Sequence, residues 1–317
     1  MRELTIAGTR IADDTDAFCV AEIGSNHQGS VERCKLLFRA AADCGVNAVK
    51  LQKRDNKTLF TPEMYHQPYH SEHAFGVTYG EHREALEFGW DEYVELKAYA
   101  ESLGLIFFAT AFDIPSADFL QKLAVPCFKI ASGDLTNIPL LQHIADSDWD
   151  IPVIVSTGGG TRDDVQRARL QLVPFPPHAF LQCTAAYPVE PAEMNLRVIA
   201  SYRDMMPETV IGLSDHQNGI AMGPPAYVLG ARIFEKHFTI NRAWKGSDQA
   251  FSLEPIGMKK YVRDLKRVRE ALGDGIKRPY ASETAPLHKM QKSIVPAHDL
   301  PVGHVVEWAA LETRSPN

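Results

Sequence analysis

Eight short apolar runs recur along the 317-residue chain, and most are followed by a stretch whose apolar residues have helical spacing. Continuous apolar runs of this length are typical of parallel strands that are covered on both faces. Strands that alternate with helices in this way predict a closed (β/α)8 barrel, or TIM barrel. The predicted strands are 18–23, 48–52, 105–109, 127–131, 153–156, 180–183, 210–213 and 233–236.

The stretches between the strands predict amphipathic helices around the barrel. Their ranges are 30–44, 91–103, 116–123, 138–145, 162–172, 220–230 and 257–272. Ser30, Ser116 and Thr161 are the predicted N-caps. Residues 3–12 predict an N-terminal β-hairpin. We expect the barrel domain to span 1–277, with a linker over 278–292 and a short C-terminal extension over 293–317, too small for a core of its own.

Composition excludes several classes of partner. The net charge of −7 and the hydrophobic content of 45% predict a globular protein that binds neither nucleic acid nor an anionic membrane surface. No apolar run approaches the roughly 20 residues of a membrane span, and the first residues lack a secretory apolar core. Five cysteines, mostly in apolar runs, predict reduced thiols in the cytoplasm, and Cys183 is interpreted as one of these rather than as a nucleophile.

Polar side chains stand at the carboxyl ends of the predicted strands, which converge on one face of a barrel. Lys50 and Lys129 lie within apolar runs, where an unpaired ammonium is unfavourable. They are either partners in buried ion pairs or part of an anion cradle. The second interpretation gains support from Ser132, Ser156 and the glycine-rich turn 158–160, which supply hydroxyl and backbone donors for a phosphate and a carboxylate.

Two histidines, His216 and His237, follow neighbouring predicted strands. They are either core residues or ligands of an open site that holds a divalent ion such as Mn²⁺ or Mg²⁺ and polarises a carbonyl. Candidate acids and bases at the same face are Glu22, Asp134, Asp215 and Asp248. These observations alone predict a metal-assisted enzyme that acts on a small phosphorylated anion.

The connection after the second predicted strand, 53–89, is far longer than usual and rich in His and Tyr. It is either a solvated excursion or a lid that recognises substrate, and an Arg or His within 66–83 is a candidate contact for a second phosphate.

Several stretches, taken together, resemble the N-acetylneuraminate (sialic acid) synthase family. They include Ala21-Glu-Ile-Gly-Ser-Asn-His-Gln-Gly29, Lys129-Ile-Ala-Ser-Gly-Asp134, Ile211-Gly-Leu-Ser-Asp-His216, Glu235-Lys-His-Phe-Thr239 and Lys245-Gly-Ser-Asp-Gln-Ala-Phe-Ser-Leu-Glu-Pro255. The resemblance implies condensation of phosphoenolpyruvate with an N-acyl-hexosamine, commonly N-acetylmannosamine or its 6-phosphate, and release of phosphate. It also implies a homodimer.

The resemblance assigns a role to each candidate residue. Phosphoenolpyruvate contacts fall on Lys50, Lys129, Ser132, Ser156 and Ser214. Sugar contacts fall on Gln52, Tyr187 and Asp248, and acid/base carboxylates on Glu22 and Asp134. The metal ligands fall on His216 and His237, with Mn²⁺ expected and Mg²⁺ or Co²⁺ as alternatives.

The chain departs from the family pattern at two places. Family members often carry Asn or Ser at the position of Ala185. The family usually ends in an antifreeze-like domain that caps the partner's site with an arginine; here 293–317 matches only its beginning, and Arg314 lies near the expected arginine. Two alternatives to a sialic acid synthase therefore stay open: a synthase for a related nonulosonate, of legionaminic or pseudaminic type, and a ligand-binding barrel without catalysis.

Overall fold

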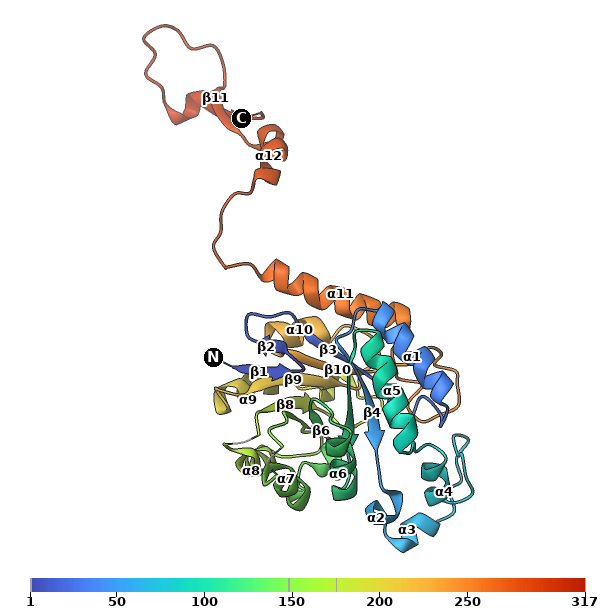
Figure 1. Ribbon diagram of the computed structural model, residues 1–317. Coiled ribbons are helices and arrows are strands. Elements are labelled where there is room, and N and C mark those ends of the chain that lie inside the picture. Colours follow the sequence, from blue (N-terminus) through green and yellow to red (C-terminus); the bar gives the residue numbers. More distant parts are fainter. Residues whose placement is uncertain (1, 148, 175, 317) are drawn as a thin grey trace. The chain divides into compact units, whose positions relative to one another are not determined.

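The computed structural model describes residues 2–147, 149–174 and 176–316, and its central element is a closed barrel of eight parallel strands (Figure 1). Around the barrel the order is β10-β3-β4-β5-β6-β7-β8-β9, so neighbours in sequence are neighbours in space. The predicted (β/α)8 architecture is confirmed. The strands are β3 (Phe18–Glu22), β4 (Ala48–Lys53), β5 (Ile106–Ala111), β6 (Phe128–Ile130), β7 (Val153–Ser156), β8 (His178–Cys183), β9 (Val210–Asp215) and β10 (Ile233–His237).

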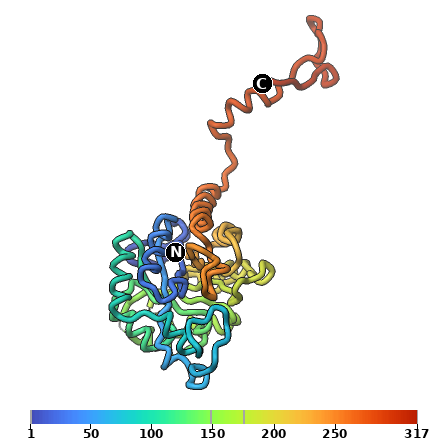
Figure 2. Tube along the Cα trace, turned by 90° about the vertical axis from the view of Figure 1, so that its right-hand side faces the viewer, coloured from blue at the N-terminus to red at the C-terminus, as the bar shows by residue number. Residues whose placement is uncertain are grey.

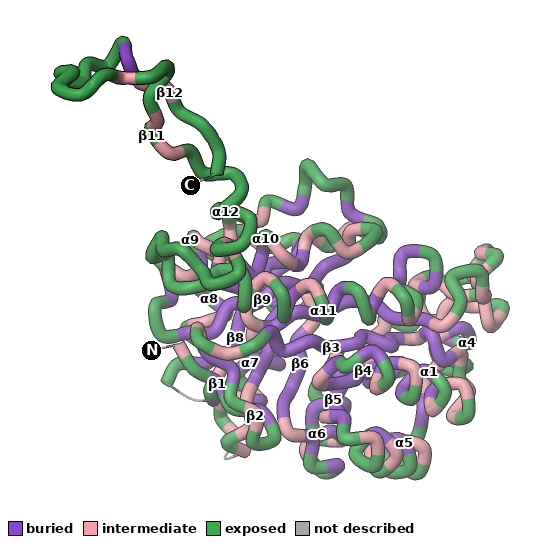
Figure 3. The backbone as a smooth tube through the Cα atoms, turned by 90° about the horizontal axis from the view of Figure 1, so that it is seen from above, coloured by how far each residue is buried: buried purple, intermediate pink, exposed green. Residues whose placement is uncertain are grey.

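Helices cover the outside of the barrel, one after each strand. They are α1 (Val31–Asp43), α5 (Trp90–Ser102), α6 (Ile114–Lys122), α7 (Ile138–Ala145), α8 (Arg162–Leu172), α9 (Val198–Met205), α10 (Gly223–Val228) and α11 (Pro255–Leu272). The prediction missed α9, which is only eight residues long. The strands between these helices are almost entirely buried (Figure 3), so the core lies between the barrel and its helical layer.

Two of the three predicted N-caps are confirmed. The Ser30 hydroxyl accepts a hydrogen bond from the Arg33 backbone, and Thr161 forms a capping box at the start of α8. The prediction for Ser116 is wrong, because α6 begins two residues earlier and Asp113 is its cap. Pro115 stands in the first turn of that helix, where its missing N–H has no consequence.

The N-terminal hairpin is confirmed as β1 (Glu3–Ile6) and β2 (Thr9–Ala12), which pair antiparallel. Its inward residues Leu4, Ile6 and Ile11 are buried in the core. Gly8 has a φ of +76°, which the tight connection requires and which glycine adopts without strain.

The connection between β4 and α5 projects at one end of the barrel in both Figure 1 and Figure 2. It contains three short helices, α2 (Asn56–Leu59), α3 (Pro62–His66) and α4 (Tyr79–Glu84). A cluster of rings holds it together: His82 is buried and contacts Tyr69, Phe75 and Tyr79. Burial lowers the pKa of His82 to about 4, so its ring packs in the neutral form at neutral pH.

The chain divides into two compact units, with the boundary between Ala271 and Leu272. The second unit contains α12 (Thr284–Met290) and a two-stranded sheet of β11 (Ser293–Pro296) and β12 (Leu311–Arg314). Residues 278–292, expected to be a linker, therefore include a helix. Among the described residues, no helix combines the length and the apolar character needed to cross a bilayer.

Candidate active site

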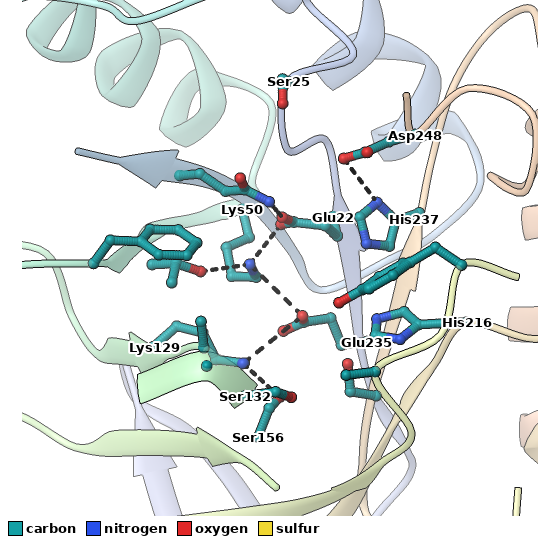
Figure 4. Close-up of a pocket in the computed structure, with 18 of the residues that line it drawn as sticks. Glu22, Ser25, Lys50, Lys129, Ser132, Ser156, His216, Glu235, His237 and Asp248 are labelled. Atoms are coloured by element: carbon teal, nitrogen blue, oxygen red, sulfur yellow. Dashed lines mark hydrogen bonds and ion pairs between the residues drawn. The ribbon is translucent and has the colours of Figure 1, made fainter. Parts of the chain in front are cut away.

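A cavity of about 280 Å³ opens at the carboxyl ends of the barrel strands. Of the twelve residues to which the sequence assigns roles, all except Asp134 line it. They come from seven of the eight strands or the turns that follow, and Figure 4 shows how labelled side chains converge; the remaining strand, β5, contributes Thr110 to the lining. The residues it brings together are Glu22, Lys50, Gln52, Lys129, Ser132, Ser156, Tyr187, Ser214, His216, His237 and Asp248.

Lys50, from β4, is almost fully buried and is surrounded by oxygen atoms. Its Nζ lies 2.6 Å from Glu22 Oε2 and 3.6 Å from Glu235 Oε1. It also donates to Thr110 Oγ1 at 2.7 Å. The sequence left two interpretations of Lys50 open, a buried ion pair or part of an anion-binding site. Both hold together, because the paired ammonium belongs to a residue that also lines the cavity.

Lys129, from β6, completes a cluster of two lysines and two glutamates (Figure 4). Its Nζ donates to Ser156 Oγ at 2.6 Å and to the Ile130 carbonyl at 3.0 Å. Glu235 Oε1 is 3.9 Å away and so lies between the two ammoniums. The formal charges of the two lysines and the two glutamates cancel. Within this cluster, Lys129 shares its carboxylate partner, Glu235, with Lys50.

Burial shifts the protonation equilibria of this cluster. Burial raises the pKa of Glu22 to about 7 and outweighs the opposing charge of Lys50. Burial also acts to raise the pKa of Glu235, but Lys129 and Lys50 more than offset it and hold the pKa below its ordinary value. The pKa of Lys129 is lowered by burial and, to a smaller extent, by the charge of Lys50. A carboxyl group with a pKa near neutrality is suited to proton transfer.

The serine side of the cavity is closely packed. Ser132 Oγ accepts the backbone N–H of Gly158 at 3.0 Å. A Cβ atom at Gly158 would lie 2.8 Å from Ser132 Oγ and 2.9 Å from the Ala185 backbone nitrogen, so only glycine fits there. The glycine-rich turn 158–160 therefore packs against Ser132 but does not itself line the cavity, and the expectation that its backbone N–H groups face the anion is not met at Gly158, whose N–H is used by Ser132.

His216 and His237 face each other with ring centroids 5.5 Å apart. His216 Nδ1 lies 3.0 Å from the Thr184 carbonyl, which can only accept, so this nitrogen carries the proton and Nε2 keeps its lone pair. His237 Nδ1 is buried without a hydrogen-bond partner, and Asp248 Oδ2 is 3.8 Å from it. Burial lowers the pKa of His237, so its imidazole is neutral at neutral pH.

These two imidazoles fit a divalent ion. His216 has Nδ1 engaged with the Thr184 carbonyl, His237 has Nδ1 without a hydrogen-bond partner among the described residues, and imidazole nitrogen is a preferred ligand of Mn²⁺, Co²⁺ and Zn²⁺. Across the described residues, no cluster of three or more His, Cys, Asp or Glu side chains could hold a metal. The donor set therefore matches an open site, in which water or substrate oxygens complete the coordination.

Gln52 connects the lysine cluster to a second part of the cavity. Its Nε2 donates to Glu22 Oε1, and its Oε1 accepts from Arg54 Nη2, both at 2.7 Å. A Cβ atom at Gly24 would lie 3.2–3.3 Å from Gln52, Asp248 and Glu22, which shows that these three side chains converge. The ring of Tyr187 lies 4.2 Å from that of His216.

Two candidate carboxylates lie elsewhere. Asp134 belongs to the 3-10 turn Ser132–Asp134, and its Oδ1 accepts from Asn137 Nδ2 at 3.0 Å outside the cavity lining. Asp215 is buried beside Lys236, with Oδ2 2.9 Å from Nζ, and likewise does not line the cavity. Among the candidate acids and bases, the cavity keeps Glu22 and Asp248.

Sequence reasoning missed two charged lining residues, Glu235 and Arg54, and included a third, Arg83, only as one of several candidates within 66–83. Side chains two apart on a strand share a face, so Glu235 precedes His237 on the inward face of β10. The same period of two relates Lys50, Gln52 and Arg54. Arg83, the only arginine in the range 66–83, is brought to the cavity by the fold of the long connection. Its presence there favours recognition of substrate over a solvated excursion.

Known proteins match the chain over most of its length. The NeuB family model matches residues 37–277. N-acetylneuraminate-9-phosphate synthase of Homo sapiens is 39% identical over 308 residues, which cover 97% of this chain and 85% of that protein. N,N'-diacetyllegionaminic acid synthase of Campylobacter jejuni is 32% identical over 94% of this chain and 90% of its own.

A solved structure agrees with these matches. The crystal structure of N-acetylneuraminic acid synthetase from Leptospira borgpetersenii, in complex with citrate, superposes with a TM-score of 0.77 at 31% identity. The superposition covers 90% of this chain and 95% of that one. The chain therefore belongs to the NeuB family, which confirms the resemblance to N-acetylneuraminate synthases that its sequence motifs indicated.

Proposed function

We propose that the chain is a nonulosonic acid synthase that condenses phosphoenolpyruvate with an N-acyl-hexosamine and releases phosphate. Membership of the NeuB family makes it a phosphoenolpyruvate-dependent condensing enzyme. The observation that carries the proposal is the buried Lys50–Glu22–Glu235–Lys129 cluster, which adjoins the histidine pair in one cavity. This arrangement suits a small dianionic substrate beside a divalent ion, and it disfavours a ligand-binding barrel without catalysis.

Lys50 and Lys129 bind phosphoenolpyruvate, together with the hydroxyl groups of Ser132, Ser156 and Ser214. Phosphate and carboxylate groups compete with Glu22 and Glu235 for the two ammoniums, since charge-assisted contacts to a dianion are strong. The buried surroundings strengthen these contacts and fix the orientation of the enol carbon.

His216 and His237 would hold a divalent ion, Mn²⁺ in preference to Mg²⁺ or Co²⁺, which would supply Lewis-acid polarisation of the acceptor aldehyde. Asp248, whose Oδ2 lies 3.8 Å from His237 Nδ1, contacts the sugar. Gln52 and Tyr187 contact the sugar from the other walls of the cavity.

Glu22 is the proton-transfer residue that the cavity supports best. Attack by the enol carbon leaves positive charge at C2 of the pyruvyl group, and water adds there before the C–O bond to phosphate breaks. Glu22 lines the cavity and its pKa is raised to about 7 by burial, so it exchanges a proton at neutral pH. Asp134 is the weaker candidate because it lies outside the lining.

The acceptor class distinguishes the sialic acid reaction from its relatives. A synthase for a related nonulosonate, of the legionaminic or pseudaminic type, is the second candidate, since the relative of Campylobacter jejuni named for N,N'-diacetyllegionaminic acid is 32% identical. A panel of acceptors that includes N-acetylmannosamine, its 6-phosphate and a 2,4-diacetamido hexose separates these candidates.

The test is phosphate release from phosphoenolpyruvate with each acceptor and Mn²⁺. The proposal expects acceptor-dependent release that disappears in Lys50→Met. Phosphoenolpyruvate binding without release on any acceptor would contradict catalysis and favour a binding role.

We also propose that residues 293–317 are a partial antifreeze-like segment and that the protein is a homodimer. The proposal rests on the sequence resemblance over 293–317. Light scattering at several concentrations tests it, and a mass of one chain at every concentration would contradict it.

A further inference from the structure

Two arginines line the cavity apart from the lysine cluster. Arg54 directly follows β4, and Arg83 lies in α4 of the long connection. Gln52 stands between Arg54 and Glu22 and is hydrogen-bonded to both. The cavity therefore has a lysine end and an arginine end.

Neither guanidinium has a carboxylate partner in the part of the chain that the structure describes. The Arg54 side chain donates only to the Gln52 amide oxygen, at 2.7 Å. The Arg83 side chain donates only to the Tyr79 hydroxyl, from Nε at 3.1 Å and from Nη2 at 2.9 Å. Glu87, whose charge acts on Arg54, is already paired with Lys53 at 2.7 Å.

The charge of each arginine acts on the other. Burial, and then the charge of Arg83, lower the pKa of Arg54 to about 10. The charges of Glu87 and Asp248 oppose this shift without direct contact. Two half-buried cations that contact no carboxylate repel each other, and a bound anion would relieve the repulsion. The unfavourable arrangement therefore indicates a ligand with negative charge at this end.

Both guanidiniums are held in fixed orientations. Arg54 stacks on the ring of Phe112 at 3.7 Å, and its hydrogen bond to Gln52 leaves Nε and Nη1 for a ligand. Arg83 is fixed by Tyr79, and a capping box of Thr78 and Glu81 stabilises its short helix. A planar guanidinium with unused donors suits the bidentate recognition of phosphate.

We propose that Arg54 and Arg83 bind a phosphate group on the acceptor sugar, at the end of its carbon chain remote from the aldehyde. The acceptor is then an N-acyl-hexosamine 6-phosphate. The inference rests on the proposed function, because the lysine end is taken by phosphoenolpyruvate and the aldehyde by the histidine end. Ser25 lines the cavity (Figure 4) and, with both arginines, a smaller pocket, so it adds a hydroxyl donor at this end.

Arg83→Gln tests the proposal, with turnover measured on N-acetylmannosamine 6-phosphate and on N-acetylmannosamine. We expect kcat/KM for the phosphorylated acceptor to fall roughly 10- to 100-fold, the effect of one lost hydrogen bond to a charged group. For the unphosphorylated acceptor we expect a change below about twofold, and no change in KM for phosphoenolpyruvate. Arg263→Gln, on the exposed side of α11, is the matched control and leaves all three values unchanged.

Equal losses on both acceptors, or a rise in KM for phosphoenolpyruvate alone, would overturn the proposal. Arg83→Lys keeps the charge without the planar fork and should recover part of the loss. It also replaces the Gln variant if that protein does not fold.

Binding of an unreactive analogue separates this proposal from the proposed function. N-acetylmannosaminitol 6-phosphate has no aldehyde, so calorimetry reports its affinity even in a protein without turnover. Tighter binding of this alditol phosphate than of the plain alditol, with the difference lost in Arg83→Gln, supports the arginine site. Equal binding of the two alditols by the wild-type protein would overturn it.

Discussion

Replacing Lys129 by methionine should separate the binding role of the lysine cluster from its effect on stability. Methionine has a similar length and refills the buried volume with apolar atoms. The change removes the ammonium that donates to Ser156 and leaves Glu235 paired with Lys50 at 3.6 Å.

The opposing electrostatic contributions of Lys129 nearly cancel in the empty cavity. At 3.9 Å from Glu235, unit charges attract by about 4 kcal/mol when the effective dielectric constant is about 20. Removing an ammonium from water costs several kcal/mol, and the lowered pKa of Lys129 shows that burial outweighs Glu235. We therefore expect Lys129→Met to change the free energy of unfolding by less than about 1.5 kcal/mol, or to increase it.

Phosphoenolpyruvate binding should respond much more strongly. Loss of a buried charged contact weakens binding by roughly 3 kcal/mol, or about 100-fold in Kd. Urea unfolding measures the first quantity and calorimetric titration the second. Lys97→Met, which removes a lysine paired with Glu101 on the surface of α5, is the control and should affect neither by more than about 1 kcal/mol. A loss of more than about 3 kcal/mol of stability with unchanged phosphoenolpyruvate affinity would refute the reasoning.

Three further predictions concern single residues. Burial raises the pKa of Glu22 from 4.5 to about 7, so between these values the native state holds a proton that the unfolded chain has lost. The stability of the wild-type protein should therefore fall as pH rises from about 5 to about 7. Urea unfolding at several pH values should show that Glu22→Gln lacks this part of the pH dependence. Parallel pH profiles for the two proteins would contradict it. His237→Ala should abolish turnover and divalent-ion binding while the unfolding free energy changes by no more than about 2 kcal/mol, and retained turnover after chelation of the wild type would argue against the metal assignment. Gly158→Ala should displace Ser132, 2.8 Å from the added Cβ, and raise the Kd for phosphoenolpyruvate about tenfold in calorimetry; an unchanged Kd would show that this packing does not matter for binding.

The barrel was predictable because its strands are buried on both faces. Their apolar runs and the helical periods between them identify eight units without any tertiary information, and the closed barrel confirms the order. Helix ends were less predictable: Asp113 caps α6 in place of Ser116, since the proline at position 115 allows an earlier start. The helix α9 was missed although it is as long as α7; its N-cap position is Arg197, which makes no side-chain capping hydrogen bond, so the usual start signal is absent.

The cavity lining was predictable wherever a side chain continues a strand. Lys50, Lys129 and His237 follow from strand position alone. Asp134 does not reach the cavity, because a 3-10 turn after β6 places its carboxyl group against Asn137. The sequence indicated the range 66–83 as a source of a cavity residue, but that Arg83 is the residue that reaches the cavity depends on how the long connection folds back.

The central claim is that Lys50 and Lys129 bind phosphoenolpyruvate directly beside an ion held by His216 and His237. Paramagnetic relaxation of the phosphoenolpyruvate ³¹P signal in the presence of Mn²⁺ measures that proximity. The account predicts strong enhancement in the wild-type protein, and its loss in His237→Ala, which should still bind phosphoenolpyruvate. Normal binding of both phosphoenolpyruvate and Mn²⁺ without any enhancement would contradict the claim.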